Sequence, residues 1–519
     1  MNDVYVLHEQ LPYAYFFRET LSEDSLAASL ERVLAAFPVL GGRLCLDSHA
    51  ILLSDDDAVP LSIGHTEVPL DEWLERGHGV HPETGRPQLM PLFDPLPEHP
   101  WSSRTPLARV RVTHMAGGGT CLGINISHAA ADGASCIRFV YCWGRQHRGL
   151  PYPIPANNRA EVTVNGMLTP DKADLMNLRA DESGGGVGGG IISQVFGFSA
   201  ALLGMEQAAA AAAPSAEPHS FLLLSFHEEV LHAMKSYGNH ECKRVLASSS
   251  PEDADQEEGG GPGVSFVSTN DMVTSAGWML MRQLSGNQDW GMNIVVNIRG
   301  RGGTQNFGAG HGLFGNGITA ATATVATESA TSDDDYEAEM ASVAKGARAA
   351  RRALTSCYEH LPERLAASQR GTPELSAAIG PAFCTTSWHF PLWELDFADD
   401  TSGDGEWDAA PAASSGAAGA NGKEEVQPHG FGAAAYAQAI EAHVPSERED
   451  DREHGRPIAF HGQPVHPLPP GETYAGIVVP TAGTGLDYQL FLPTAKITEA
   501  QRIHKRMCEA FKATAAVGV

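Results

Sequence analysis

The stretch TCLGINISHAAADGAS, at positions 120–135, constrains the fold more than any other part of this chain. In its first half, aliphatic residues alternate with smaller or polar ones: Leu122, Ile124 and Ile126. This period of two predicts a half-buried β-strand. The sequence AAADG then breaks the alternation, and residues 134–145 are expected to form a helix. His128 is therefore expected at the end of a strand, directly before a tight turn.

A histidine in that position suits general-base catalysis, because its pKa lies close enough to 7 for it to take a proton from a hydroxyl or an amine. Asp132, four residues later, is better placed to brace the turn through a hydrogen bond or salt bridge than to share the chemistry. The alternative is an ordinary core histidine, since H-x-x-x-D alone occurs by chance in many chains. Residues 107–115 alternate as well, and glycines at 117–119 predict a β-hairpin that delivers His128.

The stretch resembles the H-x-x-x-D-G motif of the BAHD acyltransferases, which move an acyl group from coenzyme A to an alcohol or amine. Further segments resemble the family's motifs in the family's order, between about residue 10 and residue 495: 37–44, 143–149, 268–278, 297–301, 314–316, 386–388 and 396–397. Related acyltransferase groups commonly carry a second histidine where this chain has Ser127. That difference favours the BAHD family over condensation domains and wax synthases.

The resemblance implies an α/β fold, with mixed sheets and flanking helices in two similar chloramphenicol-acetyltransferase-like domains around a central channel. A length of 519 residues also favours more than one domain, since single cores rarely exceed roughly 250 to 300 residues. We expect an N-terminal half at 1–180 that carries the motif, a low-complexity crossover linker at 181–219, and a C-terminal half at 220–519. Within the last, residues 398–454 are expected to be a low-complexity insertion.

The resemblance also implies roles for individual residues. His128 would be the general base in the middle of the channel, and Gly133 would belong to the structural frame of the site with Asp132. Arg299, with Arg301 as the second choice, would pair with Asp132 and tie the halves together. Three further residues are candidates for substrate or coenzyme binding: Thr386, Ser387 and Trp388. Acyl-coenzyme A is expected as a co-substrate, with no permanently bound cofactor and no metal.

The C-terminal signature of the family, D-F-G-W-G followed by a basic residue and proline, is divided in this chain. Asp396-Phe397 is followed by acidic low-complexity sequence, and Gly455-Arg456-Pro457 resembles the resumption of the pattern. We expect the missing W-G part to affect folding precision or coenzyme binding more than the chemical step. The segment 388–391 also lacks the arginine that some relatives use for shikimate or quinate, which disfavours an acidic polyol acceptor.

Secondary structure in the second half is partly predictable. Residues 292–298 form a continuous apolar run, which predicts a strand buried on both faces. Residues 270–284 are expected to form a helix capped by Thr269 or Asn270. His454, His461 and His466 lack the carboxylate or thiol neighbours of a metal site, so we interpret them as loop histidines.

Composition narrows the classes of partner. Lys and Arg number 35 against 63 Asp and Glu, a formal net charge of −28, which argues against nucleic acid or an anionic membrane surface as the partner. The eight cysteines show no zinc or C-x-x-C spacing and suit a reducing compartment. No apolar run reaches the ~18 residues that a membrane span needs, and the N-terminus does not resemble a signal peptide. We expect a cytoplasmic monomer of secondary metabolism, with a start that lacks a short family segment.

Two alternatives stay open at the level of sequence. The first has the same fold but takes its acyl group from a carrier protein, as condensation domains do. The second is a non-catalytic binding protein that has retained the fold, which the divided C-terminal signature favours. The presence of His128, Asp132, Gly133 and Arg299 opposes this second alternative. The acyl group, the acceptor and the choice between O- and N-acylation cannot be derived from the sequence.

Overall fold

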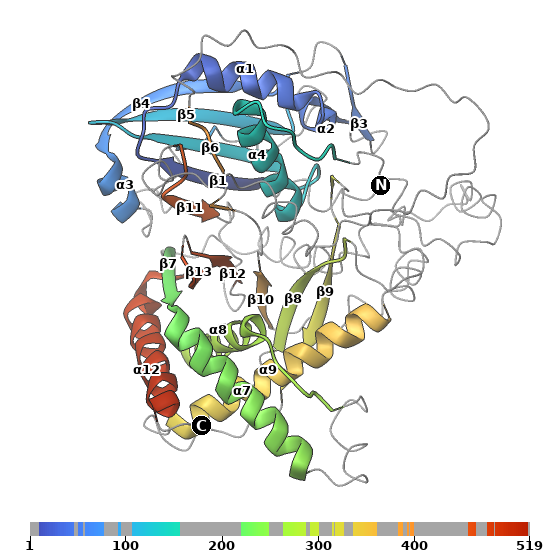
Figure 1. Ribbon diagram of the computed structural model, residues 1–519, viewed down its shortest axis with the longest axis vertical. Coiled ribbons are helices and arrows are strands. Elements are labelled where there is room, and N and C mark those ends of the chain that lie inside the picture. Colours follow the sequence, from blue (N-terminus) through green and yellow to red (C-terminus); the bar gives the residue numbers. More distant parts are fainter. Residues whose placement is uncertain are drawn as a thin grey trace, which may run out of the picture.

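The computed structural model describes the following residues: 10–45, 50–54, 58–76, 92–94, 106–155, 219–248, 263–286, 291–299, 314–315, 317–325, 336–360, 382–387, 392–393, 395–398, 455–462, 475–481 and 483–516. The described parts form two layered bodies, one above the other in Figure 1. Each body contains a mixed sheet with flanking helices, as the family resemblance implied.

The first body is built on a five-stranded sheet with the order β11-β1-β6-β5-β4. Its strands are β1 (Gln10–Phe17), β4 (Leu61–Pro69), β5 (Ala108–Ala116), β6 (Thr120–Ser127) and β11 (Ala459–Gly462). β5 and β6 pair antiparallel as the predicted hairpin. Gly117, Gly118 and Gly119 in its turn have φ angles of 78°, 111° and 94°, which glycine adopts without steric penalty.

Helices α1 (Glu23–Leu34) and α4 (Gly133–His147) cover one face of this sheet. Ser22 is the N-cap of α1, and its hydroxyl accepts a hydrogen bond from the Ser25 N–H at 3.3 Å. The alternating side chains of β6 are fully buried beneath the helices: Leu122, Ile124 and Ile126. Smaller elements complete this body: α2 (Pro38–Gly41), α3 (Leu70–Arg76), β2 (Arg43–Cys45) and β3 (Ala50–Leu52).

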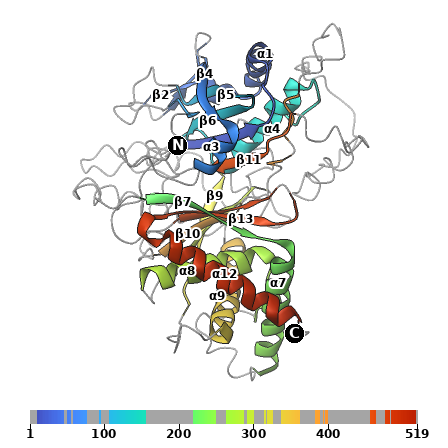
Figure 2. The same ribbon diagram turned by 90° about the vertical axis from the view of Figure 1, so that its left-hand side faces the viewer.

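The second body contains a six-stranded sheet with the order β7-β13-β12-β10-β8-β9. Its strands are β7 (His219–Phe226), β8 (Gly291–Asn297), β9 (Ile318–Ala323), β10 (Ala382–Ser387), β12 (Ala475–Pro480) and β13 (Leu486–Pro493). Its helices are α7 (Glu228–Ser248), α8 (Thr269–Ser285), α9 (Tyr336–Glu359) and α12 (Ile497–Ala516), with the short η6 (Thr494–Lys496) before α12. The helices lie on the far side of the sheet, so its other face is turned toward the first body (Figures 1 and 2).

Two local predictions need refinement. The predicted strand at 292–298 corresponds to β8, and its face toward the helices is apolar through Met292, Ile294 and Val296. Asn293 and Asn297 lie on the opposite face of β8, so the strand is not apolar on both faces as the continuous apolar run suggested. The predicted cap of α8 was wrong. Ser268 is the N-cap, because Asp271 completes a reciprocal capping box with it.

Segments from late in the sequence complete the first body. β11 pairs antiparallel with β1 at the edge of the five-stranded sheet. Four further late residues lie in the same apolar core as the β6 side chains: Phe314, Leu392, Leu395 and Phe397. The chain therefore returns to the first body after forming much of the second. The proposed division at 1–180, 181–219 and 220–519 stays a proposal, and residues 156–218 lie outside the described ones.

The two flanks of the expected insertion meet directly. The Phe397 N–H donates a hydrogen bond to the Gly455 carbonyl at 2.8 Å. Gly455 has a φ of 73°, and a Cβ there would lie only 2.1 Å from the Ala398 backbone nitrogen, so a side chain cannot fit. Residues 399–454 lie outside the described part of the chain. Residues 397 and 455 are thus adjacent in the fold although 57 residues lie between them in the sequence.

Candidate active site

His128 follows the last residue of β6 and is only partly buried. The turn after it is built locally. Ser127 has a hydroxyl that accepts a hydrogen bond from the Ala129 N–H at 3.3 Å, and its carbonyl accepts one from the Ala130 N–H at 2.9 Å. The three alanines of the turn are fully buried, which anchors it in the core. His128 therefore projects from a rigid support.

Asp132 is the N-cap of α4, and Gly133 is the first residue of that helix. The Asp132 Oδ1 accepts a hydrogen bond from the Ser135 N–H at 2.9 Å, which satisfies one of the free amides at the helix N-terminus. The Asp132 side chain is 1% exposed. This is the bracing role that the spacing predicted for the aspartate.

Arg299, two residues after the end of β8, makes the predicted pair with Asp132. Its Nη1 lies 2.9 Å from Asp132 Oδ2, and its Nη2 donates to Oδ1 at 3.0 Å. Gly317 adds a backbone N–H bond to Oδ2 at 2.7 Å. The pair is bidentate and links the first body to the second.

Asn297 orients Arg299 from the preceding strand. Its Oδ1 accepts hydrogen bonds from the Arg299 backbone N–H at 3.1 Å and from Nη1 at 3.2 Å. Gly317 lies against the other side of the guanidinium, where a Cβ would come within 2.8 Å of the Arg299 Cζ. The side chain is therefore fixed by contacts on several sides.

Ser135 was missed in the sequence analysis. Its hydroxyl donates to the Gly315 carbonyl at 2.8 Å and accepts from the Gly315 N–H at 3.0 Å and Arg299 Nη2 at 2.9 Å. The one proton and both lone pairs of the Ser135 hydroxyl are thus all engaged in hydrogen bonds. Its position three residues after an N-cap aspartate was the available signal. Phe314, beside Gly315, stacks edge-on against Phe37 with a ring-centroid distance of 5.0 Å.

Burial alone would raise the pKa of Asp132. The Arg299 guanidinium and the hydrogen bonds from Arg299, Gly317 and Ser135 outweigh burial and hold this pKa below its usual range. The carboxylate is therefore ionised at neutral pH. The pKa values of two nearby thiols are shifted upward instead. Burial raises the pKa of Cys136 well above its usual value and that of Cys142 to about 12. Neither is an activated nucleophile.

The divided C-terminal signature braces the other end of α4. Arg148 Nη1 donates to the Ala398 carbonyl at 3.1 Å, and its Nε lies 3.5 Å from Asp396 Oδ2. The Phe397 ring is fully buried, with its centroid 5.1 Å from that of Trp143. At 1.5 Å per residue, Trp143 lies about 15 Å and Arg148 about 22 Å along α4 from its N-terminus. The signature supports the helix rather than the surroundings of His128.

The remaining predicted residues are only partly described. Thr386 and Ser387 are the last two residues of β10, and Trp388 lies outside the described residues. Arg301, His454 and His466 also lie outside them. His461, expected in a loop, is instead a buried residue of β11, because this segment forms the sheet edge. Among the described residues, no group of three or more His, Cys, Asp or Glu could hold a metal ion.

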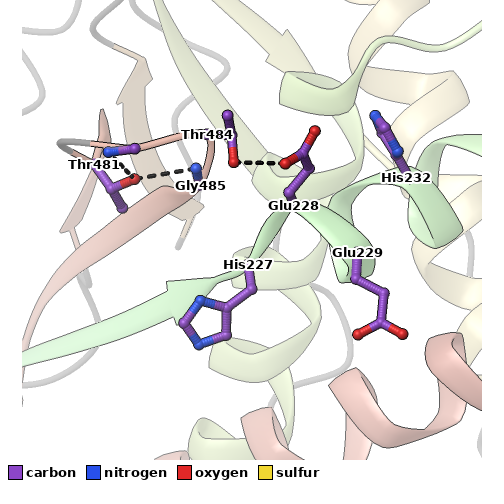
Figure 3. Close-up of a pocket in the computed structure, with 8 residues that line it drawn as sticks. His227, Glu228, Glu229, His232, Thr481, Thr484 and Gly485 are labelled. Carbon is purple, nitrogen blue, oxygen red and sulfur yellow. Dashed lines mark hydrogen bonds between the residues drawn. The ribbon is translucent and has the colours of Figure 1, made fainter.

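A pocket of about 580 Å³ lies elsewhere, between the start of α7 and the turn that joins β12 to β13. Figure 3 shows Thr484 donating a hydrogen bond to Glu228, at 2.7 Å, beside His227 and His232. None of the residues expected at the active site lines it. No helix in the described ranges is long and apolar enough to cross a membrane.

Comparison with known proteins agrees with this architecture. Residues 3–181 match the model of the Transferase family, to which the BAHD acyltransferases belong. Shikimate O-hydroxycinnamoyltransferase of Nicotiana tabacum is 29% identical over 158 residues, 30% of this chain and 35% of that enzyme. Phenolic glucoside malonyltransferase 1 of Bemisia tabaci is 33% identical over 146 residues, 27% of this chain and 30% of that enzyme. The alignments thus span about a third of these relatives.

Solved structures share the fold across nearly the whole chain. Vinorine synthase has a TM-score of 0.53 at 17% identity, covering 96% of this chain and 89% of that one. F. sporotrichioides TRI101, solved with coenzyme A and T-2, has a TM-score of 0.54 at 14% identity and covers 98% of both chains. The expected α/β fold of the acyltransferases is therefore confirmed.

Proposed function

We propose that this chain, a BAHD-type protein by the sequence of residues 3–181 and by its fold, transfers an acyl group from acyl-coenzyme A to a hydroxyl or amine of a small molecule. The observation that carries the proposal is the partly exposed His128, which lies between β6 and the N-terminus of α4, where the Asp132–Arg299 ion pair joins the two bodies. Acyl-coenzyme A is a co-substrate, and the complex of TRI101 with coenzyme A supports this choice.

His128 is the general base in the proposed reaction. It removes the proton from the acceptor hydroxyl or amine as the oxygen or nitrogen attacks the thioester carbonyl. The tetrahedral intermediate then collapses, the carbon–sulfur bond breaks, and His128 returns the proton to the leaving thiolate. No covalent acyl-enzyme forms. The oxyanion needs fixed hydrogen-bond donors, for which Thr386, Ser387 and Trp388 are the candidates.

Asp132 has a positioning role in this proposal. Both of its carboxylate oxygens are already engaged: Oδ1 accepts hydrogen bonds from Ser135 and Arg299, and Oδ2 accepts one from Gly317 and forms the ion pair with Arg299. This arrangement favours a brace for the turn over a proton relay to His128. Gly133 begins α4 beside it, and Arg299 ties this turn to the second body.

The acceptor is proposed to be neutral or basic rather than an acidic polyol, because residues 388–391 lack an arginine. The relatives whose sequences align include enzymes named for shikimate, for phenolic glucosides and for putrescine. Both O- and N-acylation therefore stay within the proposal. We also propose that the protein is a cytoplasmic monomer that acts in secondary metabolism.

The test is free-thiol release from a panel of acyl-coenzyme A donors with alcohol and amine acceptors. We expect release that depends on an acceptor and falls by at least about a hundred-fold in His128→Ala, the lower range for loss of a general base. His65→Ala is the matched control, because this exposed histidine lies on β4. Release that survives in His128→Ala would remove the histidine from its role.

The alternatives predict different results in the same assay. Transfer only from an acyl group on a carrier protein, with none from free acyl-coenzyme A, would favour the condensation-type reaction. Binding of coenzyme A without transfer to any acceptor would favour the non-catalytic protein.

A further inference from the structure

Gln489 joins the two sheets through a single side-chain amide. It lies in β13 of the six-stranded sheet and is 3% exposed. Its Nε2 donates to the Phe460 carbonyl at 3.1 Å, and its Oε1 accepts from the Gly462 N–H at 3.3 Å. Both partners belong to β11, the edge strand of the other sheet.

The alternation of side chains explains how a polar residue reaches this position. Tyr488 and Leu490 on either side of it are buried in the core beneath α7, α8, α9 and α12. Gln489 therefore points to the opposite face, which is turned toward the first body. Ile477, its partner on β12, packs against the core of the first body from the same face.

The Gln489 amide takes the place of one residue of a neighbouring strand. In a parallel ladder, each bonded residue has two partners on the adjacent strand. Its N–H donates to the carbonyl of one residue, and its carbonyl accepts from the N–H of the residue two positions further along. Phe460 and Gly462 are related in this way. Without Gln489, the buried Phe460 carbonyl and the buried Gly462 N–H would each lose this hydrogen bond, at a cost of about 1–3 kcal/mol each.

The contact connects the strands that carry both parts of the proposed site. From Gln489 the ladder runs through β11 and β1 to β6, which ends at His128. In the other direction, Gln489 is opposite Ile477, and Ile477 is opposite Thr386 on β10. One amide thus lies between the strand of the base and the strand of the candidate oxyanion donors.

We propose that Gln489 is a positioning residue that sets the spacing of His128 against Thr386 and Ser387 across the two sheets. This proposal rests on the proposed acyl transfer. It assigns the interface a second anchor, separate from the Asp132–Arg299 pair at the end of α4. Two separate contacts fix the relative position of two rigid bodies better than one contact does, because bodies joined at a single contact can still rotate about it.

Two substitutions test the hydrogen bonds. Gln489→Leu removes both, and we expect kcat to fall about ten- to hundred-fold while the KM for the acyl donor changes little, since misplacement of reacting groups by about 1 Å has effects of this size. Gln283→Leu is the matched control. Gln283 lies on α8 and bonds to Glu339 on α9, so its loss affects the helical layer alone.

Gln489→Glu supplies a readout that a purely structural role would not give. The protonated carboxyl can still donate to the Phe460 carbonyl and accept from Gly462. The ionised form cannot donate and faces a carbonyl oxygen. The ratio of variant to wild-type kcat should therefore approach 1 at about pH 5 and fall as pH rises, because burial raises the pKa of a carboxyl. This variant also keeps the test open if Gln489→Leu does not fold.

Hydrogen exchange separates this proposal from the proposed function. The Gly462 amide should exchange slowly in the wild type and at least ten-fold faster in Gln489→Leu. An unchanged exchange rate of Gly462, or a pH-independent kcat ratio for Gln489→Glu, would overturn the role of Gln489. Absence of acyl transfer by the wild type would instead count against the proposed function.

Discussion

Asp132 and Arg299 form a buried ion pair, with 2.9 Å between Oδ2 and Nη1 and side chains that are 1% and 4% exposed. They are far apart in the sequence and belong to different bodies, Asp132 as the N-cap of α4 and Arg299 after β8. Asp132 also caps α4, while Asp396-Phe397 braces the opposite end of that helix. The helix that follows the His128 turn is thus held at both ends by residues from the second half of the sequence.

Removal of one partner of this pair should destabilise the protein strongly. In Arg299→Leu the Asp132 carboxylate stays buried without its counter-charge, and we expect the free energy of unfolding to fall by about 3–5 kcal/mol. Urea unfolding at pH 7 measures the change. The double variant with Asp132→Asn should lose less than the sum of the single variants. Strict additivity would contradict direct coupling.

The Asp132 carboxyl should also contribute to acid unfolding. Its folded-state pKa is lowered, by Arg299 and by backbone N–H groups against the effect of burial. Its contribution to stability is therefore present above the unfolded-state pKa of about 3.9 and is lost as pH falls through the folded-state value. The stability difference between wild type and Asp132→Asn should shrink as pH is lowered from about 5 toward 3. A difference that grows in that range would refute the assigned direction.

Ser135→Ala should cost about 1–3 kcal/mol of stability, because the buried Gly315 N–H loses its acceptor. Arg299 also loses a contact, so acyl transfer should fall in parallel. Thermal unfolding and the thiol assay together measure both effects. The exposed Ser356 on α9 offers a control, since Ser356→Ala should change stability by less than about 0.5 kcal/mol. Equal losses for the two serines would argue against a special role of Ser135.

Excision of residues 399–454 should leave a folded protein. The flanks already meet through the Phe397–Gly455 hydrogen bond, so a connector of a few residues closes the gap. A shorter loop lowers the entropy cost of closure by about 2 kcal/mol, and we expect equal or higher stability in urea unfolding. Phe397→Ala, by contrast, should cost about 3–5 kcal/mol because the ring is fully buried. Loss of folding on excision would show that the segment contributes to the core.

Sequence reasoning succeeded where the signal was local or carried by ordered motifs. The period of two in β6, the glycine turn before it and the spacing from His128 to Asp132 all report on neighbours along the chain. The pairing of Arg299 with Asp132 is long-range, and it came only from the resemblance to a known family. The cap of α8 was missed although its signal is local, because several adjacent polar residues suit an N-cap and the capping box of Ser268 with Asp271 was overlooked.

The sequence by itself determined the β5–β6 hairpin, the helix α4 and the position of the histidine between them, because side-chain periodicity and turn chemistry act between near neighbours. Only the tertiary structure decided that β11 returns to the first sheet, that Ser135 uses its whole hydroxyl on Gly315 and Arg299, and that Gln489 completes the edge of β11. These contacts depend on hydrogen-bonding groups that long stretches of chain separate. Their need for partners becomes apparent only when the buried edges and helix ends have been placed.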